Sequence, residues 1–191
     1  MKTMSAEKNV LLTTSREPTD KIRTFCNDLA HSIPNVVHVN RGKLSLDGVA
    51  EKALELDADR IVIADRWKDG FVNIRFFRTG VSGLTPYPPL INVASVRFRR
   101  ESEAKTKPIR SLAVTVPSQN SSAAKKLAHS IGDFFDIPVL IGQDKVSNFS
   151  AVILISTSAL DRLQITFVLL PSLVEVGPRI NVSKVVWDEW K

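Results

Sequence analysis

The chain has 191 residues, of which 43% are hydrophobic, and it carries a net charge of +6. This length and apolar content predict one or two folded domains and exclude a disordered chain. No apolar run approaches the roughly 18 residues that a membrane-spanning helix needs, and the first residues lack the apolar stretch of a signal peptide. The single cysteine, Cys26, excludes an internal disulfide framework and a multi-cysteine zinc site. We therefore expect a cytoplasmic protein with no membrane partner.

The first half of the chain alternates strand and helix patterns. Strands are predicted at 9–13, 36–39, 60–64, 71–77 and 90–98, and helices over 22–33 and 46–57. Thr19 or Asp20 can cap the first helix, and Pro34 ends it. Asp69-Gly70 predicts the turn of a hairpin, and a stretch rich in glycine and proline leads to the strand at 90–98.

The second half repeats this order of patterns. Strands are predicted at 111–116, 137–141, 151–155, 162–170 and 180–187, with one helix over 124–135. Asn120 or Ser121 can cap that helix. Residues 142–149 take the place of the loop and the second helix of the first half.

Two sequence matches support an internal duplication. The pentapeptide Leu-Ala-His-Ser-Ile occurs at 29–33 and again at 127–131. The segment PLINVASV at 89–96 aligns with PRINVSKV at 178–185, in the same order along the chain. Two matches in one order, set in parallel strand and helix patterns, predict two related halves packed about a pseudo-twofold axis. Residues 105–108 are the expected joint between the halves.

The charge is concentrated near the end of the first half. Residues 66–110 hold ten basic and three acidic side chains, a net charge of +7, whereas the rest of the chain sums to −1. A local basic stretch is typical of a protein with a polyanionic partner, nucleic acid first. A solvated face that only aids solubility is the alternative, and charge by itself does not separate the two.

No pattern for catalysis is present. The chain has neither a phosphate-binding loop, nor a dinucleotide-binding glycine motif, nor a serine elbow. Cys26 lies on the apolar stripe of the first helix, which indicates a small core residue rather than a nucleophile. His31 and His129 lie about 200° around their helices from the leucine two positions earlier, on the outer side, and they lack the spacing of metal ligands. We predict no catalytic residue, metal site or cofactor.

Three further motifs resemble the Brix domain family. Thr13-Thr14-Ser15 with Pro18-Thr19 is similar to the family's opening, and Arg41-Gly42 to the pair after its second strand. Most specific is Glu175-Val176-Gly177-Pro178-Arg179, close to the family's signature near the domain end. One departure is Gly83-Leu84-Thr85-Pro86, where eukaryotic members commonly carry Gly-Pro-Thr.

The resemblance implies a fold and a function. The fold is α/β, a single Brix domain over 1–191 with pseudo-symmetric half-repeats at 9–104 and 109–188, each resembling the anticodon-binding domain of class IIa aminoacyl-tRNA synthetases. The implied function is that of a non-catalytic ribosome-biogenesis factor, as in the short archaeal members. Its partners would be ribosomal RNA or its precursor, with rRNA processing or assembly as the role, and other assembly proteins.

Eight cations are candidate RNA contacts. Four are expected in loops, where ligand contacts concentrate, and four on strands: Arg16, Arg41, Lys43 and Arg179, then Arg75, Arg78, Arg97 and Arg99. Arg75 shares a strand face with Phe71 and Phe77, which would stack on RNA bases if exposed, although a core position is favoured for the rings.

Arg97 and Arg99 are expected on one strand face opposite Phe98. Two alternatives stay open at this point. The first concerns Arg179, which either contacts RNA or pairs with a carboxylate. The second functional hypothesis is a protein-interaction scaffold, with an exposed apolar patch around residues 81–90 or at Trp187 and Trp190.

Overall fold

The computed structural model describes residues 8–66, 72–99, 108–142, 146–158 and 161–188. They form a mixed α/β fold. The strands are β1 Asn9–Thr14, β2 Val36–His38, β3 Ala58–Arg66, β4 Val72–Gly80, β5 Gly83–Arg97, β6 Leu112–Val116, β7 Val139–Ile141, β8 Ala151–Thr157, β9 Leu163–Leu169, β10 Val174–Glu175 and β11 Arg179–Val186. The helices are α1 Asp20–Ser32, α2 Leu46–Glu55 and α3 Ser122–Phe135, with a short 3-10 helix, η2, at Val146–Asn148. Among the described residues no helix has the length and apolar composition to cross a bilayer.

The helix starts follow from their caps. The Thr19 hydroxyl accepts the Ile22 N–H at the start of α1, and the Ser121 hydroxyl accepts the Ala124 N–H at the start of α3. Helix α2 ends at Glu55, two residues before its predicted end, because Asp57 takes a left-handed conformation (φ 51°) that turns the chain into β3.

All strands belong to one mixed sheet of 11 strands. Its order is β2-β1-β3-β4-β5-β11-β9-β8-β6-β7, with β10 paired to β9. In each half the first three strands pair in parallel and the later ones antiparallel. The order of the second half mirrors that of the first, and β5 and β11 join the halves as antiparallel neighbours.

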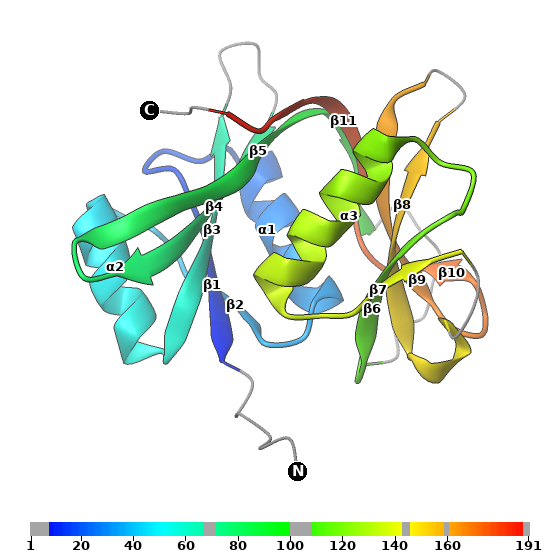
Figure 1. Cartoon of the computed structure of the whole chain (residues 1–191). Helices are drawn as coiled ribbons and strands as arrows, with labels where there is room; N and C mark the ends of the chain where they lie inside the picture. The colour runs from blue at the N-terminus through cyan, green and yellow to red at the C-terminus, as the bar shows by residue number, and fades with distance from the viewer. Residues whose placement is uncertain (1–7, 67–71, 100–107, 143–145, 159–160, 189–191) are drawn as a thin grey trace.

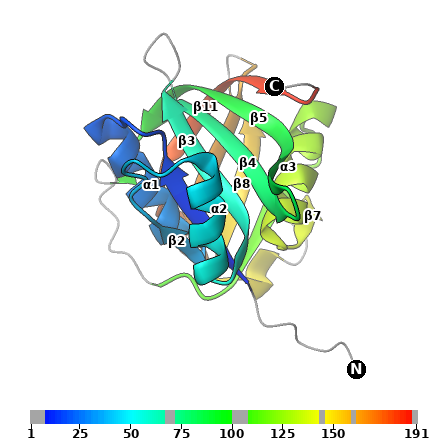
Figure 2. The same cartoon turned by 90° about the vertical axis from the view of Figure 1, so that its left-hand side faces the viewer.

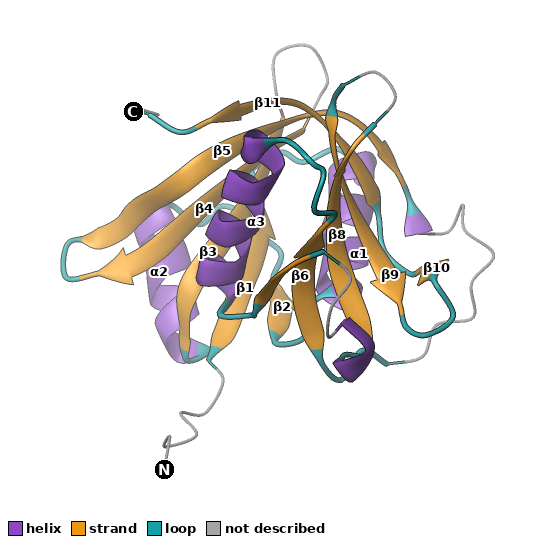
Figure 3. Cartoon of the chain, turned by 45° about the vertical axis from the view of Figure 1, so that its right-hand side comes forward, coloured by secondary structure: helices purple, strands orange, loops and turns teal. Residues whose placement is uncertain are grey.

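The sheet curves into an arch, and α1 and α3 lie between its two walls (Figure 1). Because side chains alternate along a strand, β1 directs Val10 and Leu12 into this inner core and Leu11 to the outer face. On the outer face of the first half α2 covers a second, smaller core (Figure 2). On the outer face of the second half, the segment of η2 takes that place (Figure 3).

Strand β5 is longer than predicted. The stretch rich in glycine and proline belongs to it from Gly83 onward, paired with β4 alone, while β11 begins to pair with β5 only at Leu90. Prolines fit here because the open side of the strand needs no N–H donors. The predicted turn at Asp69-Gly70 lies outside the described residues. Strand β10 was not predicted, because two residues are too few to show a period.

Candidate functional site

One edge of the first half gathers cations from separate loops and strand ends. Thr14 pairs with Ala64 in parallel register, so Arg16, in the turn after β1, and Arg66, the last residue of β3, lie at the same edge. Both side chains belong to exposed residues. The loop after β2 ends beside them, because β2 is the other neighbour of β1. The carboxyl ends of these parallel strands therefore bring basic loops together.

The buried Arg41 side chain holds the loop after β2 against the end of β1. It is only 7% exposed, its Nε donates to the Leu44 carbonyl at 2.9 Å, and its Nη1 donates to the Thr14 carbonyl at 3.3 Å. Burial lowers the pKa of Arg41, and the nearby Asp65 carboxylate opposes that shift. The guanidinium therefore ties the loop to β1, and the exposed Lys43, two residues on, is the cation that the loop presents to solvent.

Arg75 completes the edge from β4. It forms an ion pair with Asp65, and its guanidinium lies 5.7 Å from the centre of the Phe77 ring. Burial raises the pKa of Asp65, and Arg75 and Arg41 oppose the rise. We call Arg16, Lys43, Arg66 and Arg75 the basic edge. It stays net positive beside Glu17 and Asp65.

Phe77 does not form a stacking surface. It is 4% exposed and packs in the core beneath α2, so its core position is confirmed and the exposed alternative is wrong for this ring. Phe71 lies outside the described residues. Asp65 was missed by sequence reasoning, and its only signal is an acidic residue placed directly after the apolar run of β3.

In the second half, the turn that corresponds to the one with Arg16 carries no charge. There β6 ends at Val116, and residues 117–121 read Pro-Ser-Gln-Asn-Ser, without a charged side chain. The turn after the first strand therefore differs in charge between the two halves, although their strands follow the same order.

An open groove of about 650 Å³ lies beside the basic edge, between the first turns of α1 and strands β4 and β5. Its rim carries Arg66 and Lys21, and its walls include Phe25, Val93 and Phe98. It offers a concave, partly apolar surface next to exposed cations.

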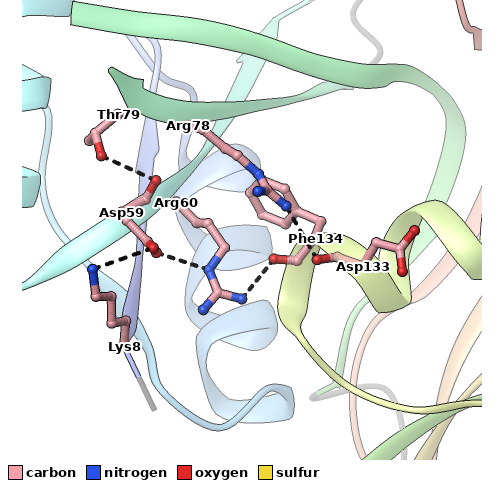
Figure 4. A network of polar contacts seen from close by, with 7 residues as sticks. All are labelled: Lys8, Asp59, Arg60, Arg78, Thr79, Asp133 and Phe134. Carbon is pink, nitrogen blue, oxygen red and sulfur yellow. Dashed lines mark hydrogen bonds and ion pairs between the residues drawn. The ribbon is translucent and has the colours of Figure 1, made fainter. Parts of the chain in front are cut away.

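Arg78 lies elsewhere, at the carboxyl end of α3. Its Nη2 donates to the Asp133 carbonyl at 3.5 Å, and its guanidinium lies 4.8 Å from the centre of the Tyr87 ring. Arg60 lies beside it, with Nη1 donating to the Phe134 carbonyl at 2.9 Å (Figure 4). Cations satisfy the free carbonyls at a helix end and complement its dipole. Both arginines come from the first half and hold a helix of the second.

Arg97 and Arg179 are partners where β5 meets β11. The Arg179 guanidinium binds both carboxylate oxygens of Glu175, which favours the carboxylate-pairing interpretation. Arg97 is exposed on β5. The prediction that Arg99 shares its strand face is wrong, because β5 ends at Arg97, and the Arg99 backbone N–H donates to Asp28 of α1 at 2.8 Å.

The Gly-Pro-Arg signature packs against the other half. A Cβ atom on Gly177 would lie 2.4 Å from the Ser32 hydroxyl and 2.7 Å from Cδ2 of Phe167. Only glycine therefore allows this segment to approach α1 so closely.

The cysteine and the helix histidines lie where they were predicted. Cys26 is fully buried, and burial raises the pKa of its thiol to about 12. His31 and His129 are exposed. Within the described part of the chain, no three His, Cys, Asp or Glu side chains lie close enough to hold a metal ion.

The predicted apolar patches are covered only in part, since Val81, Pro86 and Pro88 are exposed. Val81 at the tip of the β4–β5 hairpin is fully exposed, but Leu90 is 8% exposed. Trp187 is half-buried, with the Lys126 ammonium 4.1 Å from its ring centre. Trp190 lies outside the described residues.

No protein-family model matches the chain, but its sequence is similar to curated archaeal proteins named probable Brix domain-containing ribosomal biogenesis proteins. The one from Aeropyrum pernix is 42% identical over 52 residues, 27% of this chain and 29% of that protein. The one from Pyrococcus horikoshii is 32% identical over 69 residues, 36% of this chain and 31% of that protein. The one from Pyrobaculum aerophilum is 27% identical over 185 residues, 93% of this chain and 95% of that protein.

Two solved structures share the fold. A probable ribosomal biogenesis protein from Aeropyrum pernix superposes with a TM-score of 0.75 at 24% identity, over 94% of this chain and 99% of that one. An archaeal Imp4-like protein superposes with a TM-score of 0.63 at 18% identity, over 94% of this chain and 100% of that one. The relatives are named as biogenesis factors, not as enzymes. The chain is therefore similar, over nearly its whole length, to archaeal proteins named probable Brix domain-containing ribosomal biogenesis proteins.

Proposed function

We propose that this protein is a non-catalytic ribosome-biogenesis factor that binds ribosomal RNA or its precursor directly through the basic edge, and so assists assembly or rRNA processing. Its homology to archaeal ribosomal biogenesis proteins supports the class of function. The observation that carries the RNA contact is the gathering of Arg16, Lys43 and Arg66, from three separate segments, at one exposed edge.

The proposed contact is mainly electrostatic. Arginine and lysine side chains neutralise phosphates and release the counterions condensed on the RNA, so the affinity falls as salt rises. Arg75 is the most constrained of the four cations, because it already pairs with Asp65. The groove beside Arg66 gives an unpaired nucleotide a concave surface to enter, as single-stranded RNA readers provide.

Titration of labelled ribosomal RNA fragments, followed by fluorescence anisotropy at several salt concentrations, tests this proposal. The double variant Arg16→Glu with Lys43→Glu should weaken binding at least about tenfold and lower the slope of log affinity against log salt by about 1 to 2. Arg162→Glu with Lys184→Glu, at two exposed cations of the second half, is the matched control, because it changes the net charge by the same amount. Absence of RNA binding at low salt, or equal affinity of the double variant and the control, would contradict the proposal.

We further propose that the two halves, 9–104 and 109–188, descend from one duplicated α/β unit. The pairing of β5 with β11 supports this. Val93 and Val182 occupy equivalent positions in the matched segments and pair with each other. Around them, Arg97 pairs with Arg179 as Leu90 pairs with Val186, which is the pattern of a twofold axis.

A further inference from the structure

The outer side of α2 exposes a row of apolar side chains. Leu46 is 43% exposed and Leu54 is 69% exposed, with the half-exposed Ala50 between them. At 100° per residue these three positions fall within about 80° of the helix surface. Only Val49 and Ala53 of α2 are fully buried against the sheet. The apolar surface of the helix therefore extends well beyond what the fold covers.

An acidic row runs next to the apolar one. Asp47, Glu51 and Glu55 are exposed and each follows one residue after a member of the apolar row. Lys52 forms an ion pair with Glu55 and compensates one of these charges. This surface is thus negative in a chain whose net charge is +6.

We propose that α2 docks a basic, partly apolar segment of another protein. Apolar side chains of that segment would cover Leu54 and Leu46, and its lysines or arginines would face Glu51 and Asp47. Mixed apolar and charged rows on a helix are complementary to an amphipathic segment of opposite charge. This inference goes beyond the proposed RNA contact, and it gives the protein a second surface for a second kind of partner.

Charge argues against the other occupants. RNA would be repelled by Asp47, Glu51 and Glu55. A symmetric pair of α2 helices from two copies of this chain would bring the same acidic rows together, and like charges at an interface oppose association. A basic protein segment is favoured by both rows at once. Such a segment would itself bind RNA, so α2 would compete with RNA for it.

A synthetic peptide tests the proposal. The probe is a helical peptide of about 15 residues, with leucine at every fourth position and lysine beside each leucine. Its addition to isotope-labelled full-length protein should shift the amide resonances of α2, and the shifts should weaken as salt is raised. A peptide with glutamate in place of lysine should leave them in place.

Two variants assign the surface. Glu51→Lys and Leu54→Ser should each weaken peptide binding by about tenfold, which corresponds to about 1.4 kcal/mol. Their matched controls are Asp161→Lys, at an exposed acid, and Leu173→Ser, at a leucine that is 72% exposed, both in the second half. The controls should keep the affinity of the unmodified protein, and RNA binding through the basic edge should be equal in all four.

Three results would overturn the proposal. They are the absence of α2 shifts at millimolar peptide, equal loss of binding in the α2 variants and their controls, and concentration-dependent self-association that Leu54→Ser abolishes. The last result would assign the surface to a second copy of the chain. The peptide test does not depend on RNA binding. The double variant of the basic edge should lose affinity for RNA and keep its affinity for the peptide, so either proposal can fail without the other.

Discussion

The Ser130 hydroxyl donates a hydrogen bond of 2.7 Å to the carbonyl oxygen of Pro88, and so joins α3 of the second half to β5 of the first. The equivalent serine of the other pentapeptide, Ser32, is fully buried and lies against Gly177. Pro88 and Gly177 directly precede the matched segments at 89–96 and 178–185. The repeated pentapeptide therefore places a serine against the opposite half, while its histidine stays on the surface.

Replacing Gly177 by alanine should destabilise the protein. The added Cβ atom would clash with Ser32 and Phe167, and overpacking of this kind costs about 1–3 kcal/mol. The free energy of unfolding from urea denaturation measures the effect. Adding Ser32→Ala should recover only part of the loss, since the contact with Phe167 remains.

Gly48→Ala is a control for which we expect the opposite change in the free energy of unfolding. A Cβ atom there meets only Cδ2 of the flexible Leu44 side chain at 3.2 Å and other side-chain atoms further away. Because alanine favours a helix more than glycine, this variant should raise the free energy of unfolding by up to about 1 kcal/mol. Destabilisation at both glycines would mean that the close approach at Gly177 is not the cause.

Arg60 should contribute to stability across the two halves. Its side chain is 12% exposed, its Nε binds Asp59 at 3.0 Å, and its Nη1 caps the Phe134 carbonyl. Arg60→Met should therefore lower the free energy of unfolding by about 1–2 kcal/mol.

Arg23→Met serves as the comparison for Arg60. Arg23 lies 3.9 Å from Asp20 in an exposed pair on α1, and exposed pairs contribute less than about 1 kcal/mol. Thermal unfolding of both variants gives the difference, and an equal decrease in the two would contradict the role of Arg60 at the end of α3.

His38 should make the stability depend on pH. Its Nδ1 lies 2.7 Å from the Asn27 side-chain oxygen, and its Nε2 is buried without a hydrogen-bond partner among the described residues. Burial lowers the pKa of His38 below 6.5 in the folded state. The neutral His38 side chain therefore contributes to the free energy of unfolding above pH 6.5, and this contribution is lost as the pH falls from there through the pKa of the folded state.

Urea denaturation at a series of pH values measures this dependence. His38→Gln should reduce the loss of stability on acidification below pH 6.5. His129→Gln, at an exposed position of α3, is the matched control. An unchanged pH profile in the His38 variant would exclude the proposed cause.

Cys26 should react with thiol reagents only when the protein unfolds. The side chain is fully buried in the inner core, and a pKa of about 12 leaves almost no thiolate near neutral pH. The rate of labelling by an aromatic disulfide should therefore follow the rate of unfolding as urea is added. Rapid labelling of the folded protein would contradict the burial of α1 against the sheet.

The apolar period predicted α1, α3 and the central strands, because a buried helix face or a buried strand leaves a continuous pattern. Strand β5 shows where this stops. Its segment from Gly83 to Pro89 is held by one neighbour only, and its prolines conceal the strand from any propensity argument. This segment is a strand because it pairs with β4, and a prediction from the segment's own residues does not take that neighbour into account.

The basic edge was predicted only in part. Arg16, Lys43 and Arg75 were among the predicted RNA contacts, whereas Arg66 was not. The grouping of all four depends on which strands are neighbours. Arg41 and Arg78 illustrate the error that remains. Both look like loop or surface cations, yet one is buried beneath its loop and the other satisfies carbonyls at the end of α3. Charge in a sequence does not reveal whether the charge is already used inside the fold.

The pairing of β5 with β11 has a consequence for whether the two halves can separate. The halves share backbone hydrogen bonds and one inner core to which α1 and α3 both contribute. Separating them would expose that inner core, so a fragment that contains either half by itself would keep only the smaller core on its outer face. In the proposed complex, RNA would therefore meet one continuous sheet and core rather than two modules joined by a linker.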